Sequence, residues 1–124
     1  MESPGLRTAR LGVAAFFLTT GTLHFTHAGS FERIVPEALP AAGALVAISG
    51  VAELAGGIGL LVPSLRRPAS IGLVALLAAV LPANVNMAVE HERLAPGVPV
   101  WLLWARIPLQ LALAWVVLRV GRRG

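Results

Sequence analysis

The sequence has 124 residues, enough for one domain, of which 56% are hydrophobic and 13% are charged. Soluble domains carry about a quarter charged residues, so this composition excludes an ordinary soluble domain and predicts integration into a membrane. The net charge of +4 comes from arginines at the ends of apolar segments, which favours a role in membrane topology over nucleic-acid binding. Because the chain has no cysteine, thiolate catalysis, disulfide exchange and cysteine-ligated metal sites are excluded.

Residues 9–27 are predicted to form the first of four membrane spans, slightly shorter than the about 20 residues that a bilayer requires. Basic residues followed by an apolar stretch and Thr26-His27-Ala28 are also typical of a signal peptide. However, one helical face gathers residues that suit packing against another helix, namely Phe17, Thr20, Gly21, His24 and His27. We therefore expect a packed span, followed by a loop over residues 28–40.

This loop carries apolar residues at i, i+3 and i+4, namely Phe31, Ile34 and Val35. Their spacing predicts a short amphipathic segment that lies flat at the membrane interface. Pro36 and Pro40 are expected to end this segment and to start the next helix.

The second span covers residues 41–62 and contains Glu53, a carboxylate in the middle of an apolar segment. On a helix, Glu53 shares its face with small residues, namely Ser49, Gly50, Gly56 and Gly57. The opposite stripe is apolar and consists of Val51, Leu54, Ile58 and Leu61. A lone charge in the membrane costs between about 3 and about 15 kcal/mol, so Glu53 is expected to have a partner.

A tight basic turn at residues 63–68 precedes the third span, which covers residues 69–89. Pro82 interrupts the helical hydrogen bonds near the end of this span. We expect a kink at that point to turn both Asn84 and Asn86 towards the interior.

After a polar loop at residues 90–97, the fourth span covers residues 98–120. Arg106 and Gln110 lie one turn apart on one face of this helix, which is predicted to point inward. The opposite stripe carries the residues expected to face outward, namely Trp101, Trp104, Pro108 and Trp115. The first two of these tryptophans are expected to anchor the helix at the membrane interface.

Four spans place the N-terminus, the 63–68 turn and the C-terminus on the same side of the membrane. Seven arginines flank that side, namely Arg7, Arg10, Arg66, Arg67, Arg119, Arg122 and Arg123, whereas the opposite loops contain Arg33 and Arg93. The positive-inside rule therefore predicts that both termini are cytoplasmic. The expected fold is an all-α transmembrane four-helix bundle, with residues 1–124 forming one domain in a plasma membrane of the bacterial inner type.

The four spans bring a set of polar residues to the outer half of the bundle, namely His24, Glu53, Asn84, Arg106 and Gln110. Glu53 and Arg106 lie roughly 18 Å and 12 Å from the outer ends of their spans, at 1.5 Å per residue. We expect these two charges to form an ion pair, because opposite charges attract strongly where the dielectric constant is low. The alternative is that the polar residues only hold the helices together.

The histidines are candidates for binding a metal or haem, and His24 is spaced three residues from His27. Pairing His24 with either His27 or His91 leaves too few further ligands, so no metal site is predicted. A role for His24 as a proton carrier stays open.

Four segments follow one another in a characteristic order and spacing: Gly21-Thr-Leu-His24-Phe25, Ser49-Gly-Val-Ala-Glu53, Pro82-Ala-Asn84-Val-Asn86-Met87 and Arg106-Ile-Pro-Leu-Gln110. In this the chain resembles the DoxX-like family of small four-helix membrane proteins, over nearly its whole length. The resemblance implies that His24, Glu53, Asn84 and Arg106 form the family's polar core. The family is named after a subunit of a thiosulfate:quinone oxidoreductase, and related proteins occur in membrane redox assemblies.

Three functions are compatible with these features. In the first, the chain is a ligand-binding subunit of a membrane redox assembly, and Arg106 and His24 donate hydrogen bonds to a quinone headgroup while Glu53 orients Arg106 or relays a proton. The sequence contains no flavin or nucleotide motif, so such a role requires a borrowed cofactor or a protein partner within the lipid bilayer. The second is a small proton-coupled transporter, which the strong arginine asymmetry disfavours. The third is a scaffold or assembly factor without a catalytic site.

Overall fold

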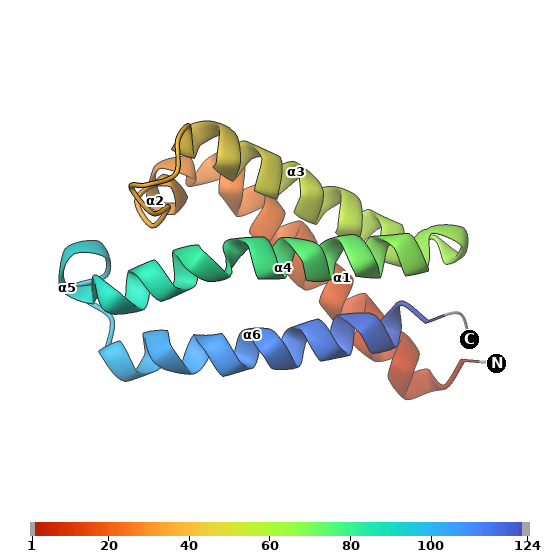
Figure 1. Ribbon diagram of the computed structural model, residues 1–124. Coiled ribbons are helices and arrows are strands. Elements are labelled where there is room, and N and C mark those ends of the chain that lie inside the picture. Colours follow the sequence, from red (N-terminus) through yellow and green to blue (C-terminus); the bar gives the residue numbers. More distant parts are fainter. Residues whose placement is uncertain (1, 123–124) are drawn as a thin grey trace.

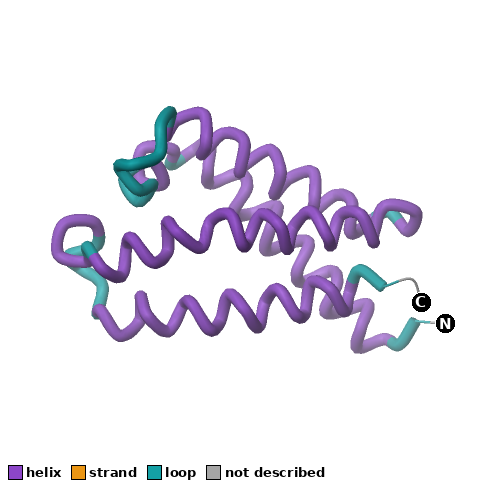
Figure 2. Tube along the Cα trace, in the orientation of Figure 1, coloured by secondary structure: helices purple, strands orange, loops and turns teal. Residues whose placement is uncertain are grey.

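The computed structural model describes residues 2–122, in which all regular structure is helical (Figures 1 and 2). Four helices are long: α1 (Pro4–Thr26), α3 (Ala42–Leu61), α4 (Arg66–Val89) and α6 (Val100–Val120). Three further helices are short: α2 (Ala28–Glu32), the 3₁₀ helix η1 (Pro63–Leu65) and α5 (His91–Leu94). The predicted all-α fold class is confirmed, and α2 and α5 add short helices to two segments that were expected to be loops.

Three segments are long and apolar enough to cross a membrane, namely Ala42–Leu61, Pro63–Val89 and Val100–Val120. They correspond to α3, to η1 together with α4, and to α6. Helix α1 has 23 residues, but its two arginines, threonines and histidine make it less apolar. The composition and the helices therefore agree on a membrane protein, with α1 as the most polar of the long helices.

Helix α1 begins at Pro4, earlier than the expected start at residue 9. The Ser3 side chain accepts a hydrogen bond from the backbone N–H of Leu6 at 3.1 Å, and Pro4 occupies the first helical turn. Serine at the N-cap and proline at the first position together favour helix initiation. The polar stretch before residue 9 is therefore largely part of the helix.

The long helices form two pairs, α1 with α3 and α4 with α6, joined where α3 turns through η1 into α4 (Figure 1). We call the end that contains Glu2, η1 and Gly121 the terminal end, because both ends of the described chain lie there (Figure 1). The opposite end, which contains α2 and α5, is called the loop end. The two pairs of helices are thus connected through η1 at the terminal end, whereas at the loop end each pair carries its own short helix, α2 or α5.

The terminal half of the bundle is packed around a buried cluster that draws on all four long helices, namely Val13, Ala14, Phe17, Leu60, Leu73, Leu77, Val117 and Val120. Glycines allow α3 to approach α4 closely in this half. A Cβ atom at Gly56 would overlap the side chain of Leu73, and one at Gly59 would lie 2.7 Å from the Cβ of Ala69. The two pairs of helices therefore touch firmly towards the terminal end.

The outer surface of the bundle carries large apolar side chains, as expected for contact with lipid. Trp101, Trp104 and Trp115 are all exposed, and so are Val51 and Ile58 on α3. The predicted outward direction of the tryptophans is thus confirmed.

Candidate ligand cavity

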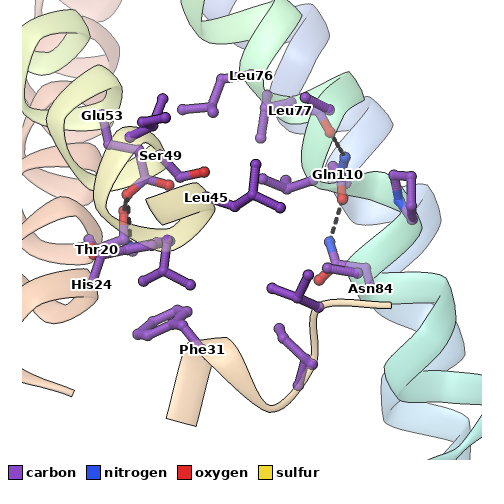
Figure 3. Close-up of a pocket in the computed structure, with 18 of the residues that line it drawn as sticks. Thr20, His24, Phe31, Leu45, Ser49, Glu53, Leu76, Leu77, Asn84 and Gln110 are labelled. Carbon is purple, nitrogen blue, oxygen red and sulfur yellow. Dashed lines mark hydrogen bonds and ion pairs between the residues drawn. The ribbon is translucent and has the colours of Figure 1, made fainter. Parts of the chain in front are cut away.

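The loop half of the bundle encloses a cavity of about 490 Å³ between the two pairs of helices (Figure 3). All four long helices contribute to its walls, and the segment that follows α2 covers it. The five polar residues singled out in the sequence all line this cavity, namely His24, Glu53, Asn84, Arg106 and Gln110. They occupy it as two separate groups on opposite sides.

The first polar group joins α1 to α3. The Thr20 hydroxyl donates a 2.6 Å hydrogen bond to Oε2 of Glu53, and Nδ1 of His24 lies 3.5 Å from the same carboxylate oxygen. Nδ1 of His24 is also 2.7 Å from the backbone carbonyl oxygen of Thr20. Because a carbonyl oxygen can only accept, Nδ1 carries the hydrogen, which leaves Nε2 as the acceptor in the neutral imidazole.

Two packing features hold this group in place. Gly21 lets α1 approach α3 at the level of Glu53, since a Cβ atom there would lie 3.1 Å from both the Glu53 Cβ and the Gly50 carbonyl oxygen. The His24 ring stacks on Phe31 with a centroid distance of 4.0 Å and an interplanar angle of 19° (Figure 3). The carboxylate and the imidazole are both buried as a result.

The second polar group joins α4 to α6. Arg106 donates to Oδ1 of Asn84 at 3.4 Å, the Asn84 amide donates to Oε1 of Gln110, and the Gln110 amide donates to the backbone carbonyl oxygen of Leu77. Each side-chain amide therefore accepts on one side and donates on the other. This satisfies Gln110, which is buried between the helices.

The predicted ion pair between Glu53 and Arg106 is wrong. The polar partners of Glu53 are Thr20 and His24 on its own side of the cavity. Arg106 contacts Asn84 and the sulfur of Met87, and its side chain is exposed rather than buried. The two charges lie on helices of different pairs, so a similar depth along the bundle does not bring them together.

The prediction that Asn84 and Asn86 both turn to the centre is also wrong. Helix α4 continues through Pro82, and the two asparagines serve different neighbours. Asn84 bonds α6, whereas Nδ2 of Asn86 donates a 3.0 Å hydrogen bond to the backbone carbonyl oxygen of Ile34. Asn86 thereby ties α4 to the segment that covers the cavity.

That covering segment was expected to lie flat at the membrane interface, but its apolar residues turn inward. Phe31, Ile34 and Val35 all line the cavity. A second tie lies nearer the surface, where Arg93 of α5 is 3.6 Å from Glu37. The i, i+3, i+4 pattern indicated an apolar face correctly, but the pattern alone does not distinguish lipid from the interior of the protein as its neighbour.

Thr20 is the polar contributor that sequence reasoning left without a role. It had been placed on the same helical face as His24, and its spacing of four residues from that histidine was the available signal. Its contact with Glu53 depends on how α1 and α3 face each other, which no local pattern reveals.

The chemistry of the cavity follows from these two groups. One side offers a carboxylate, a hydroxyl and an imidazole, the other offers amides and a guanidinium, and apolar side chains lie between them. Such a cavity suits a small molecule with polar atoms on an otherwise apolar body. Within residues 2–122, no cluster of three or more histidine, aspartate or glutamate side chains is placed to hold a metal ion.

Comparison with known proteins identifies the family to which the chain belongs. Neither curated proteins nor solved structures yielded a match to the chain. The sequence pattern of one family matches residues 13–121, a segment that includes every residue lining the cavity. The chain therefore belongs to the family described as "Domain of unknown function (DUF8561)".

Proposed function

We propose that this protein is a DoxX-like integral membrane protein of four spans whose cavity binds a small amphipathic ligand. The proposed ligand class is a quinone headgroup, and the proposed setting is a membrane redox assembly with protein partners. The three helices that are long and apolar enough to cross a membrane support this proposal. Helix α1 supplies the fourth span, because its 23 residues suffice in length and it packs along α3.

The arginines support a cytoplasmic position for the terminal end, in a plasma membrane of the bacterial inner type. Within the described residues this end carries Arg7, Arg10, Arg66, Arg67, Arg119 and Arg122, whereas Arg33 and Arg93 belong to the loop end. Arg123, which was counted with the first group, lies outside the described residues. An excess of arginine on one side is the usual mark of the cytoplasmic side.

The single observation that carries the ligand proposal is the cavity itself. Its volume of about 490 Å³ is typical of small-molecule sites. Several of its apolar lining residues are accessible from outside the protein interior: Phe16 is 41%, Ile48 65% and Leu109 62% exposed. This supports access from the lipid phase, which is where a quinone or another amphipathic molecule resides.

Each polar group would hold one side of the ligand. Arg106 and Asn84 supply N–H donors for a carbonyl oxygen of the headgroup. On the opposite side, Glu53 and the Thr20 carbonyl oxygen orient the His24 imidazole, so Glu53 positions His24 rather than Arg106. Because Nε2 is the acceptor of the neutral His24 imidazole, it would take the proton of a quinol hydroxyl while a redox partner of the assembly takes the electrons.

The test is thermal unfolding of the protein in mild detergent with increasing decylubiquinone. The quinone should raise the unfolding temperature of the wild type, because a ligand that binds only the folded state stabilises it. Arg106→Ala should weaken the apparent affinity about tenfold, as expected for the loss of a hydrogen bond to a charged group. Glu53→Gln should also weaken it, because the His24 imidazole loses the carboxylate that orients it.

Two matched variants serve as controls, Glu92→Gln in α5 and Arg119→Ala near the end of α6, since both side chains are exposed away from the cavity. Their quinone-dependent shifts should equal that of the wild type. Unchanged shifts in both Glu53→Gln and Arg106→Ala would reject a quinone site and favour a scaffold role.

A further inference from the structure

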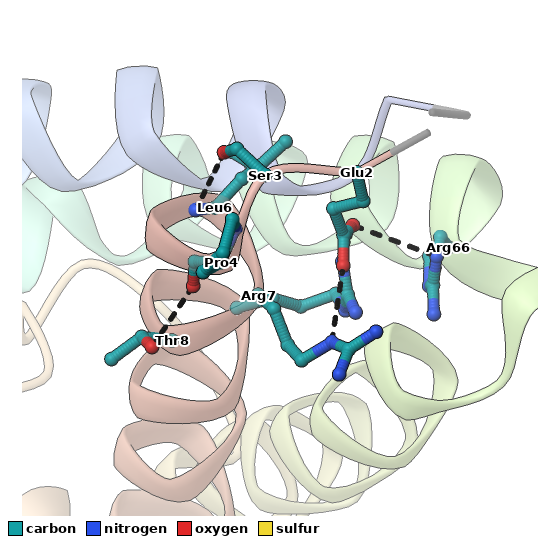
Figure 4. Close-up of polar contacts among 8 residues, drawn as sticks. Glu2, Ser3, Pro4, Leu6, Arg7, Thr8 and Arg66 are labelled. Carbon is teal, nitrogen blue, oxygen red and sulfur yellow. Dashed lines mark hydrogen bonds and ion pairs between the residues drawn. The ribbon is translucent and has the colours of Figure 1, made fainter.

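A second cluster of charged residues lies at the terminal end, far from the cavity. Arg7 of α1 and Arg66 at the start of α4 lie beside the carboxylate of Glu2 (Figure 4), and Arg10 of α1 contacts the same carboxylate. Arg10 donates a hydrogen bond to Oε2 of Glu2, Nη1 of Arg66 lies 3.7 Å from the same oxygen, and Nε of Arg7 lies 3.9 Å from Oε1. We call Arg7, Arg10 and Arg66 the arginine cluster.

The arginine cluster holds more positive charge and more donors than Glu2 can satisfy. Three guanidinium groups face one carboxylate, and the Arg10 side chain is only 5% exposed. Among the described residues, the buried Nε atoms of Arg10 and Arg66 have no hydrogen-bond partner. Burying an unpaired donor of a charged group is costly, so the cluster is built for more acceptor atoms than one carboxylate offers.

Phosphate is the chemical group that fits such an excess of guanidinium donors. It offers several acceptor oxygens, and arginine binds it in a planar, bidentate manner. The cluster also joins the first two turns of α1 to the first residue of α4, at the end of the bundle where these helices begin. In a membrane-embedded protein, this is the level at which lipid headgroups lie.

We propose that the arginine cluster is a binding site for a phosphate-bearing anion and that Glu2 occupies it as an internal competitor. The anion would be the headgroup phosphate of an anionic lipid or a soluble phosphate. Glu2 precedes the Ser3 cap of α1, so its side chain can leave the cluster without disturbing the helix. The proposal is independent of the cavity and of what binds there.

The experiment compares variants of the detergent-purified protein with three probes: dihexanoyl phosphatidylglycerol, inorganic phosphate and zwitterionic dihexanoyl phosphatidylcholine. Affinity is measured from the shift in unfolding temperature with probe concentration. Arg66→Gln should weaken binding of phosphatidylglycerol about tenfold. Glu2→Gln should tighten it about tenfold, because it removes the competing carboxylate.

The matched control is Arg67→Gln, which removes the same charge at the next position from an exposed side chain outside the cluster. It should bind like the wild type. Equal losses in Arg67→Gln and Arg66→Gln would overturn the proposal in favour of general surface charge, and so would unchanged or weaker binding in Glu2→Gln.

The three probes identify the source of the anion. Binding of phosphatidylglycerol alone supports a lipid headgroup, whereas equal binding of inorganic phosphate with the same dependence on Arg66 and Glu2 supports a soluble phosphate. Equal binding of phosphatidylcholine would overturn the requirement for an anion. Arg10→Gln is less suitable than Arg66→Gln for measuring anion binding, because Arg10 is buried and its loss affects folding.

Discussion

The two halves of the bundle are built from the same four helices but differ in how closely the helix pairs approach. Along the contact of α1 with α3, glycines permit close approach in both halves, at Gly21 near the loop end and at Gly57 towards the terminal end. Along the contact of α3 with α4, the glycines in close contact, Gly56 and Gly59, lie only in the terminal half. The pairs therefore touch in one half and enclose a cavity in the other.

This difference indicates that the positions of small residues decide where the cavity forms. Two turns before Gly56 on α3, Ser49 points to the cavity instead of to a neighbouring side chain (Figure 3). Small residues at helix interfaces in membranes let the backbones approach closely, and the resulting packing contributes to helix association. The terminal half, which we also call the closed half, then supplies stability. The loop half, which we also call the open half, supplies space for a ligand.

The largest decrease in the free energy of unfolding is expected for Gly56→Leu in the closed half. Its side chain would overlap Leu73 and push α3 away from α4. Overpacking of this kind costs about 1–3 kcal/mol. Reversible unfolding in mixed micelles measures the change in the free energy of unfolding.

Two variants make this result specific to the closed half. Gly72→Leu on α4 adds the same side chain where nothing lies within 4 Å, and Ser49→Leu adds volume to the cavity. Both should unfold within about 0.5 kcal/mol of the wild type, the range of substitutions that disturb no packing. A cost for Ser49→Leu as large as that for Gly56→Leu would contradict the contrast between the halves.

A smaller effect is expected from the polar contact between α4 and α6 in the open half. Gln110→Leu removes the partner of the Asn84 amide and should cost about 1 kcal/mol. A double-mutant cycle with Asn84→Leu measures the coupling directly. Additive free energies in the double variant would show that this contact does not hold the open half together.

The smallest effect concerns acid sensitivity at the terminal end. The hydrogen bond from Arg10, aided by the charges of Arg66 and Arg7, holds the pKa of the Glu2 carboxyl below its ordinary value despite partial burial. A lowered pKa in the folded state contributes stability above the unfolded pKa, about 4.3. That contribution is lost as the pH falls through the lower, folded pKa.

In phosphate-free buffer, the wild type should therefore lose its advantage over Glu2→Gln as the pH falls below about 4. Unfolding temperatures measured across the acidic range give both curves. Glu37→Gln is the control, because the Glu37 side chain is 87% exposed in its pair with Arg93. Parallel curves for the wild type and Glu2→Gln would show that the arginine cluster does not depend on Glu2 for stability.

Much of the fold and part of the cavity were predictable because both depend on local periodicity. Apolar stretches of membrane-spanning length indicated α3, α4 and α6, and the 3.6-residue repeat placed Glu53 on a face of small residues. The five polar residues were grouped correctly around one space, because positions along antiparallel helices translate into depth. The start of α1 was missed because the Ser3-Pro4 signal stands before polar residues rather than apolar ones.

The partners within the cavity were not predictable, because depth along a bundle says nothing about the direction in which a helix faces. Glu53 and Arg106 line the same cavity, yet the pairing of the helices places Glu53 against Thr20 and His24, and Arg106 against Asn84. The inward turn of Phe31 likewise depends on tertiary contacts. The sequence by itself determined which residues are apolar, small or charged and on which helical face they lie. Only the tertiary structure decided which faces meet, because contacts between segments far apart in the chain depend on how whole helices pack.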